Sequence, residues 1–447
     1  MGVSGNFYIA TMGCQMNDYD SDYLAQLLQS SGYKPVEQPN SADLILINTC
    51  TVRAKPQQKA YSLLGRMVAL KKKKPSLIIG MLGCIAQQEG KNLFKRFPEL
   101  DLVLGTRELE RIEEFLKKIE IDRDRVVATE LDRNPRSFAG KNGYYKGRVK
   151  SYISIMEGCN NFCSYCIVPY VRGREVSRAP RDIMKEAQHL VGQGVKEITL
   201  LGQNVNSYRW NEGEELDFPG LLHKLNRIPG LKRIRFTTSH PKDLSDDLIK
   251  CFGELEKLCP HIHLPVQSGS NKILKRMNRG YSRENYLNLV KKLRSARSDM
   301  AITSDLIVGF PGETEEDFHL TIDLIKKIGF DNTYSFKYSD RQGTRAENMD
   351  GKLPENAKGA RLAELQGLQK QITLEKNRAL KGCQVDVLVE GKSKKGGQMT
   401  GRTGGNKIVN FPSDNNNIGI IVKVVIKDAL ANSLRGELVQ EPAPQAG

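Results

Sequence analysis

Apolar runs of strand length alternate with helical patterns in two separate stretches of this 447-residue chain. In the first stretch the runs lie at residues 7–10, 43–48 and 77–82, and the segments between them carry apolar residues at helical spacing. Strands that alternate with helices predict a parallel sheet with right-handed crossovers. The carboxyl ends of parallel strands meet at one edge of the sheet, where open α/β folds bind their ligands.

The second stretch spans residues 150–350 and predicts strands at 152–156, 197–201, 233–237, 261–265, 301–308 and 332–338. Six such units indicate an open or incomplete parallel barrel. A helical pattern at 355–380 follows, and the tail then shows strand signals at 384–389, 407–411 and 418–426, separated by glycine-rich turns.

The predicted fold class is therefore α/β, with an N-terminal parallel α/β domain, a central partial (β/α)6 barrel and a small all-β barrel at the C-terminus. We place these domains at residues 1–135, 145–377 and 378–442. Charged and glycine-rich sequence within 105–150 is typical of a linker.

Composition and charge narrow the class of protein. Hydrophobic residues make up 39% of the chain, which excludes a wholly disordered protein. No apolar run approaches the ~18 residues of a membrane span, and the first residues lack a signal-peptide pattern, so we expect a cytoplasmic protein with no membrane partner. The 68 Lys and Arg residues outnumber 52 Asp and Glu residues and give a net charge of +16. This favours binding to a polyanion such as RNA, although a solvated lysine-rich surface is the alternative.

Three cysteines, Cys14, Cys50 and Cys84, each follow one of the first strands. The intervals between them each match the length of one βαβ unit, so we expect their thiols to converge at one sheet edge. Convergence suits three ligands of one metal centre, and the alternative is three buried apolar cysteines. We call these residues the N-terminal triad. A disulfide framework is disfavoured, because the chain has nine cysteines and the expected compartment is reducing.

The densest cysteine motif is Cys159, Cys163 and Cys166, with the spacing C-x3-C-x2-C. We call these residues the loop triad. Three soft thiolates close together favour zinc or an iron–sulfur cluster. Structural zinc normally takes a fourth Cys or His nearby, and none is present, which leaves a zinc knuckle or a chance cluster as the weaker alternatives. The motif follows a predicted strand and so lies at the carboxyl edge of the barrel.

The loop triad, with Tyr165 before its third cysteine, resembles the motif of the radical S-adenosylmethionine (SAM) superfamily. The segments 166–175, 201–206, 263–270 and 309–314 are similar to those of its methylthiotransferases, and the resemblance covers about the whole chain. It implies that the loop triad holds a 4Fe–4S cluster that binds SAM. It also implies that the N-terminal triad holds a second, auxiliary 4Fe–4S cluster, and that the tail is a TRAM domain that binds RNA.

The resemblance implies insertion of sulfur at an unactivated aromatic C–H bond, which requires radical cofactor chemistry. One SAM methylates a sulfide on the auxiliary cluster, and a second SAM yields the radical. Residues 336–346 are most similar to the MiaB type, which acts on N6-isopentenyladenosine beside the tRNA anticodon, although Gln342 and Arg345 replace the usual prolines. The alternatives are threonylcarbamoyl adenosine of tRNA, an aspartate of a ribosomal protein, and a non-enzymatic iron–sulfur or zinc RNA-binding protein.

The resemblance and the strand ends also suggest contacts for the cofactor. We expect SAM to contact Tyr165, Gly202, Gln203, Asn204, Gln267, Ser268 and Asp305. An ordinary βα turn is the alternative for residues 202–204, and a simple change of chain direction is the alternative around Asp305 and 309–313.

The implied substrate is the anticodon stem-loop of a tRNA. Basic residues near the loop triad and in the tail are candidates for contacts with its phosphates, and these are Arg172, Arg174, Arg178, Lys394, Lys395, Arg402 and Lys407. Ion pairs with acids such as Glu157 or Glu175 are the alternative for the three arginines. The reaction further requires a one-electron reductant such as flavodoxin or ferredoxin, and a sulfur source that the sequence does not identify.

Overall fold

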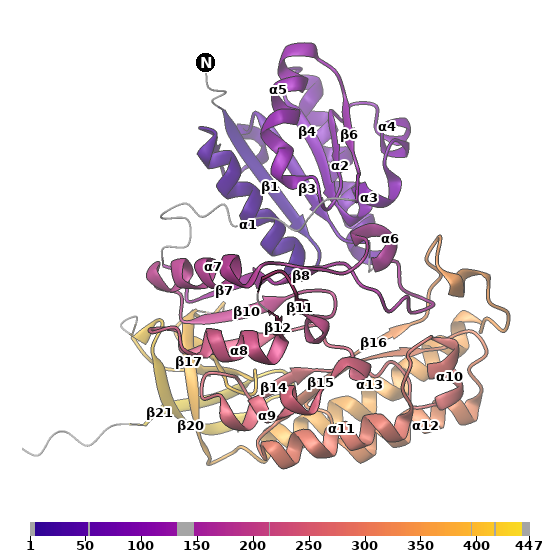
Figure 1. Cartoon of the computed structure of the whole chain (residues 1–447), viewed down its shortest axis with the longest axis vertical. Coiled ribbons are helices and arrows are strands. Elements are labelled where there is room, and N and C mark those ends of the chain that lie inside the picture. The colour runs from indigo at the N-terminus through magenta and orange to yellow at the C-terminus, as the bar shows by residue number, and fades with distance from the viewer. Residues whose placement is uncertain are drawn as a thin grey trace, which may run out of the picture.

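The computed structural model describes residues 5–51, 54–131, 147–213, 215–394, 396–414 and 417–439, with the backbone alone for 54–56. Three domains follow one another along the chain (Figure 1). The N-terminal domain lies on one side of the central domain, and the strands of the C-terminal domain lie on another. None of the described helices combines the length and the apolar character needed to span a lipid bilayer.

The N-terminal domain is a six-stranded sheet in the order β2-β1-β3-β4-β5-β6, in which every pair is parallel. Alternate residues of its central strand enter opposite cores, Leu44 and Leu46 on one face and Ile45 and Ile47 on the other. Helices cover both faces, so the domain is a doubly wound α/β fold. The strands are β1 (Asn6–Met12), β2 (Lys34–Pro35), β3 (Leu44–Thr49), β4 (Ile78–Gly83), β5 (Leu102–Leu104) and β6 (Val126–Ala128).

Helices α1 (Gln15–Ser30) and α5 (Ile112–Asp122) contribute apolar residues to the core on one face of this sheet. Helices α2 (Ala54–Lys73), α3 (Cys84–Glu89) and α4 (Asn92–Arg96) pack on the other face. Helix α5 and strand β6 lie inside the predicted first domain, 1–135, so the linker-like composition within 105–150 overlaps the end of a folded domain. The predicted boundaries at 135 and 145 lie in 132–146, outside the described residues.

The central domain has six parallel strands in two sheets, ordered β13-β10-β7 and β14-β15-β16. A parallel bridge between Ile234 and Leu258 links β13 to the segment before β14, and a continuous apolar core lies under both sheets. This arrangement is the predicted open (β/α)6 barrel. Its strands are β7 (Lys150–Ser154), β10 (Glu197–Leu201), β13 (Arg233–Phe236), β14 (His261–His263), β15 (Ala301–Val308) and β16 (Asn332–Lys337).

The helices between these strands pack outside the sheets, and a long helix, α13 (Glu355–Arg378), closes the domain. The connecting helices are α7 (Pro180–Gly192), α8 (Phe218–Asn226), α9 (Asp246–Glu254), α11 (Arg283–Ala296) and α12 (Glu315–Ile328). Shorter elements lie at the loops that carry the predicted site, and these are β8 (Met156–Glu157), α6 (Val168–Arg172), β9 (Val176–Ser177) and α10 (Asn271–Arg276).

The C-terminal domain is a closed barrel in the order β17-β18-β19-β21-β20, filled by a small apolar core. Arg233 and Arg235 of β13 fix it to the central domain. Arg233 donates to the carbonyls of Arg402 at 2.6 Å and Asp386 at 3.0 Å. The strands are β17 (Gln384–Lys392), β18 (Met399–Thr403), β19 (Ile408–Phe411), β20 (Ile421–Ala429) and β21 (Leu434–Leu438).

Candidate metal centres

The N-terminal triad lies at the carboxyl edge of the first sheet. Cys14 follows β1, Cys50 follows β3 and Cys84 begins α3 directly after β4. The strand order reverses between β1 and β3, and doubly wound sheets bind ligands at such a reversal. All three cysteines carry free thiols.

The thiols of this triad contact one another. Hydrogen bonds with the central Cys50, helped by the charge of Arg172 and opposed by burial, lower the pKa of Cys14 to about 6 and that of Cys84 to about 7. The same hydrogen bonds raise the pKa of Cys50. Two of the three sulfurs therefore favour the thiolate form, which is the form that binds metal.

Glycines before two of these cysteines allow the strand ends to approach. A Cβ at Gly13 would lie 2.9 Å from Cβ of Cys50. Gly83 has a φ of +86°, and a Cβ there would lie 2.5 Å from the carbonyl oxygen of Thr49. Asn17 completes the arrangement, since its amide donates to the Thr49 carbonyl at 3.2 Å and its Oδ1 accepts from the Cys14 N–H at 3.2 Å.

The loop triad lies in the segment between β8 and α6, and its three side chains are partly buried. The segment is fixed from two directions by backbone hydrogen bonds of Ser164. Its N–H donates to the Met277 carbonyl at 3.0 Å, and its carbonyl accepts from Ala346 N–H at 2.7 Å. The Asn278 side chain also donates to the Phe162 carbonyl at 3.0 Å.

A buried guanidinium contacts one thiol of the loop triad. Arg279 donates to Sγ of Cys163 at 3.3 Å and to the Pro265 carbonyl at 2.7 Å. Burial raises the pKa of Cys166 to about 12 and also raises that of Cys159. Coordination to a metal deprotonates a thiol regardless of this resting preference. Sequence reasoning missed Arg279, which follows the motif by more than a hundred residues and has no local signal.

The donor set fits iron–sulfur chemistry. In the described part of the chain, no three His, Cys, Asp or Glu side chains are arranged to surround a single metal ion. Zinc requires four donors around one point at about 2.0–2.3 Å. Each triad supplies three soft thiols, and three thiolates can hold an iron–sulfur cluster while one iron stays open.

The turn after β10 contacts the segment that leads into the loop triad. Oε1 of Gln203 accepts from the N–H of Gly158, which precedes Cys159. Asn204 is 1% exposed and donates to Asp243 at 2.7 Å, while its Oδ1 has no hydrogen-bond partner among the described residues. Gly202 packs against Met156, where a Cβ would lie 2.5 Å from Cγ.

Other residues predicted to contact SAM lie near the ends of β14 and β15. Gln267 has a φ of +71°, and its backbone bonds the Asp305 carbonyl at 2.9 Å. The carboxylate of Asp305 lies 3.4 Å from Nε2 of His263. Tyr165 is partly buried and meets Phe310 edge-on at 6.3 Å. These residues remain predicted contacts.

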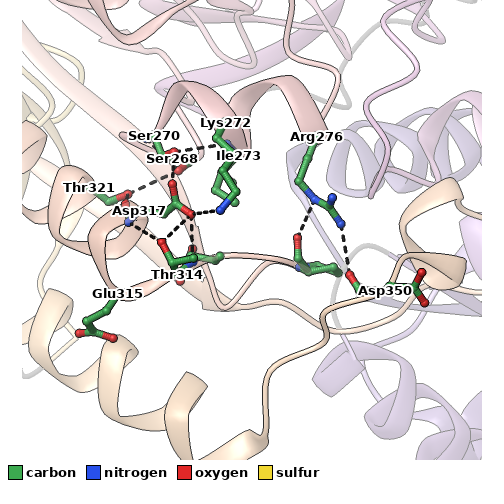
Figure 2. A network of polar contacts seen from close by, with 12 residues as sticks. Ser268, Ser270, Lys272, Ile273, Arg276, Thr314, Glu315, Asp317, Thr321 and Asp350 are labelled. Atoms are coloured by element: carbon green, nitrogen blue, oxygen red, sulfur yellow. Dashed lines mark hydrogen bonds and ion pairs between the residues drawn. The ribbon is translucent and has the colours of Figure 1, made fainter.

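Ser268 stays a predicted SAM contact, and the structure gives its hydroxyl partners within the protein. It is fully buried, and its hydroxyl accepts from Ser270 N–H at 3.2 Å and lies 3.4 Å from Oγ1 of Thr321. Figure 2 shows this hydroxyl within a polar network that includes Ser270 at the start of α10, and Asp317 and Thr314 at the start of α12.

Two of the arginines predicted to contact phosphates lie in the interior. Arg172 and Arg178 are each 3% exposed. Arg172 pairs with Asp20 at 2.9 Å, and Arg178 pairs with Glu186 at 2.8 Å. Burial in ion pairs corrects the prediction of RNA contacts for these two residues and agrees with the alternative of ion pairs, with Asp20 and Glu186 as the bonded acids and the charge of Glu157 also acting on Arg172.

The other basic residues predicted to contact RNA fall into two groups, those in ion pairs and those exposed to solvent. Lys407 lies between domains, 3.4 Å from Asp331, and Arg402 lies 3.3 Å from Glu390, so neither is a free phosphate ligand. Arg174 is exposed and stacks over the ring of Phe162 at 5.5 Å. Lys394 is also exposed, and the predicted Lys395 lies outside the described residues.

The chain matches known families in each of its domains. Residues 6–105 match the uncharacterised protein family UPF0004, residues 153–325 match the radical SAM superfamily, and residues 378–439 match the TRAM domain. The central match covers the loop triad and implies a 4Fe–4S cluster and SAM in this domain.

Solved structures with low sequence identity share the fold. The radical SAM methyltransferase TsrM from Kitasatospora setae has a TM-score of 0.58 at 16% identity, covering 76% of this chain and 75% of that one. The cobalamin-dependent radical SAM enzyme OxsB has a TM-score of 0.51 at 12% identity, covering 82% of this chain and 56% of that one.

Two relatives with high identity match over nearly their full length, and each is called tRNA-2-methylthio-N(6)-dimethylallyladenosine synthase. The protein of Syntrophus aciditrophicus is 52% identical, covering 99% of this chain and 96% of that protein. The protein of Geobacter sulfurreducens is 48% identical, covering 97% of each. This chain therefore belongs to the radical SAM methylthiotransferases, in the family of the tRNA-2-methylthio-N(6)-dimethylallyladenosine synthases.

Proposed function

We propose that this protein converts N6-isopentenyladenosine beside the anticodon of tRNA to its 2-methylthio derivative, with SAM and two 4Fe–4S clusters. Membership of the family supports the reaction. The observation that carries the proposal is the presence of two cysteine triads that are joined by one short helix. A single triad is enough for SAM cleavage, whereas sulfur insertion needs a second site to hold the sulfur.

Helix α6 makes this connection. It begins two residues after Cys166, and it packs against α3, whose first residue is Cys84. Hydrogen bonds from the N-terminal domain hold the same segment, since Thr106 Oγ1 donates to the Val171 carbonyl at 2.9 Å and Arg107 donates to the Arg174 carbonyl at 2.7 Å. A rigid connection keeps two sites at a constant separation, which a transfer between them requires.

Bound at these sites, the clusters and SAM would supply the radical chemistry that acid–base groups lack. The chain's own residues would bind and orient the cofactor. Asn204 offers a buried acceptor without a partner among the described residues, and Gln203 holds the neighbouring turn against the loop triad. We assign Tyr165, Gln267 and Asp305 to the same binding site.

Exposed groups near the loop triad suit an RNA loop. Phe162 and Tyr170 are exposed and meet edge-on at 6.2 Å, with Arg174 over the first ring. Unstacked RNA bases bind to such aromatic and guanidinium surfaces. We propose that they receive the anticodon loop, with the target base flipped out of its stack, while Lys394 contacts phosphate.

The partners follow from the chemistry. We propose a one-electron reductant such as flavodoxin or ferredoxin, and a sulfur source, not identified by the sequence, that supplies the cluster at the N-terminal triad. The reducing cytoplasm suits both the free thiols and a tRNA substrate.

Two cysteine variants test the proposal after anaerobic reconstitution with iron, sulfide and SAM. Cys163→Ala should abolish formation of 5′-deoxyadenosine, because it removes a ligand of the SAM-binding cluster. Cys50→Ala should retain SAM cleavage but yield no methylthio nucleoside in tRNA, as measured by mass spectrometry. Full methylthio product from Cys50→Ala would contradict the proposal, and Cys251→Ala, which alters a buried cysteine outside both triads, is the control.

A further inference from the structure

Arg172 is a buried cation that has no role in the reaction proposed above. It is the last residue of α6, and its side chain is 3% exposed. A buried guanidinium is costly unless opposite charges and hydrogen-bond acceptors surround it. The groups around Arg172 therefore indicate its function.

The guanidinium pairs with a fixed carboxylate, and the helix that carries it packs against the N-terminal triad. Its Nη2 donates to Oδ2 of Asp20 on α1 at 2.9 Å, and that carboxylate is 1% exposed. Val171, the residue before Arg172, packs against Cys84, and the charge of Arg172 acts on both Cys14 and Cys84. The buried carboxylate of Glu157 also acts on this guanidinium, and an arginine keeps its charge in proteins.

One nitrogen of this guanidinium donates no hydrogen bond within the described part of the chain. Nη1 of Arg172 is buried and has no hydrogen-bond partner among the described residues. A buried N–H without an acceptor is unfavourable, so it suits a site in which an acceptor arrives later. The sulfur atoms of a cluster, or a sulfide bound to one, are acceptors of this kind.

We infer that Arg172 is a positioning residue of the N-terminal triad, fixed by Asp20 so that its charge and its remaining N–H hold anionic inorganic sulfur at that site. This inference rests on the proposed function, in which the triad carries the auxiliary cluster. Three thiolates and an added sulfide accumulate negative charge, and a fixed cation stabilises the more negative states. Charge and hydrogen bonds to sulfur set the reduction potential of iron–sulfur clusters, so the potential reports on this role directly.

Arg178 provides a matched control on the same segment. It is also 3% exposed and paired with a buried carboxylate, Glu186, at 2.8 Å. It also has guanidinium nitrogens without hydrogen-bond partners among the residues that the structure describes. The charges that act on it are those of Tyr19, Glu186 and Asp182, with no cysteine among them. Loss of a buried ion pair is therefore common to both variants, whereas loss of charge at the triad is specific to Arg172.

The experiment uses the full chain with Cys159, Cys163 and Cys166 all changed to Ala, so that only the N-terminal triad can hold iron. Into this background we introduce Arg172→Gln, Arg172→Lys or Arg178→Gln. A redox titration followed by electron paramagnetic resonance gives the midpoint potential, and chemical assays give iron and acid-labile sulfide.

We expect Arg172→Gln to shift the potential to more negative values and to lower the sulfide bound per iron after incubation with sodium sulfide. Arg172→Lys should restore much of the shift, and Arg178→Gln should show neither effect. In the background with all six ligands, Arg172→Gln should reduce methylthiolation by about tenfold or more, as expected for a group next to metal ligands, while SAM cleavage persists.

An unchanged potential and sulfide content in Arg172→Gln would overturn the inference while leaving the proposed function intact. Equal effects of Arg172→Gln and Arg178→Gln would also overturn it, because they would reflect loss of a buried ion pair alone. Absence of iron from the parent with an intact Arg172 would instead refute the proposed auxiliary cluster, and the inference with it.

Discussion

His240 is held in its neutral form by the residues around it. The side chain is 5% exposed, its Nδ1 accepts from Lys242 N–H at 3.2 Å, and its ring meets Tyr281 edge-on at 5.6 Å. Burial, followed by the positive charges of Arg279 and Lys242, lowers its pKa from 6.5 to about 2. Protonation of this ring is therefore incompatible with the native packing near neutral pH.

This depressed pKa predicts a loss of stability in acid. Below pH 6.5 the unfolded chain protonates His240 and the folded chain does not, so unfolding becomes easier as pH falls. Each pH unit below that value should cost about 1.4 kcal/mol from this residue. Denaturant midpoints at about pH 7.5 and pH 5 should fall less in His240→Gln than in the wild type. An equal fall in both proteins would contradict the prediction.

The sequence predicted where the cysteines of the N-terminal triad lie, but it did not predict which arginines are buried. Cys14, Cys50 and Cys84 were predictable, because strand ends are visible in the apolar pattern and parallel strands share an edge. Arg172 and Arg174 lie two positions apart, and one is buried while the other is exposed. They lie at the end of a five-residue helix and in the loop that follows, where no periodic pattern separates inside from outside.

At the scale of elements, the bend before the loop triad depends on one glycine. Gly158 has a φ of +80°, and a Cβ there would lie 2.0 Å from the carbonyl oxygen of Arg174. The atom in the way is backbone, so no side-chain rotation relieves the clash. The glycine allows β8 to turn into the loop triad beside β9.

We therefore expect Gly158→Ala to displace the loop triad. Backbone strain of this kind costs about 1–3 kcal/mol before the clash is added. Iron bound at the loop triad and formation of 5′-deoxyadenosine should both be lost, while iron at the N-terminal triad remains. Gly192→Ala is the control, because it lies in α7 with nothing within 4 Å of its added Cβ, and it should be neutral or stabilising. Normal SAM cleavage by Gly158→Ala would contradict this account.

Elements with long apolar runs were predictable, and short ones were not. The predicted strands at 197–201 and 301–308 agree with β10 and β15 residue for residue. Strands β5 and β6 each have three residues, too few for an alternating pattern. Strands β18 and β21 each contain a glycine that packs against a neighbouring strand, Gly401 and Gly436, which weakens their strand signal.

At the scale of the whole molecule, the domains are fixed by buried arginines that donate to backbone carbonyls. Arg235 donates to Gly404 at 2.8 Å and Thr403 at 2.7 Å, and Arg107 donates to Arg174 in the same way. The number of domains was predictable from changes in pattern along the chain. Their contacts were not, because the acceptors are carbonyls that every residue carries.

The net charge of +16 predicts that tRNA binding weakens steeply with salt. Each lysine that contacts a phosphate adds about 0.7–0.9 to the slope of log affinity against log salt, because it displaces one counterion. Lys394 is exposed on the C-terminal barrel, whereas Lys407 is occupied by Asn377 at 2.8 Å and Asp331 at 3.4 Å. Lys394→Ala should therefore reduce the slope by nearly one unit in filter-binding titrations, and Lys407→Gln should leave it unchanged. A reduced slope for Lys407→Gln alone would mean that RNA displaces the interdomain ion pair and approaches from the side of α13.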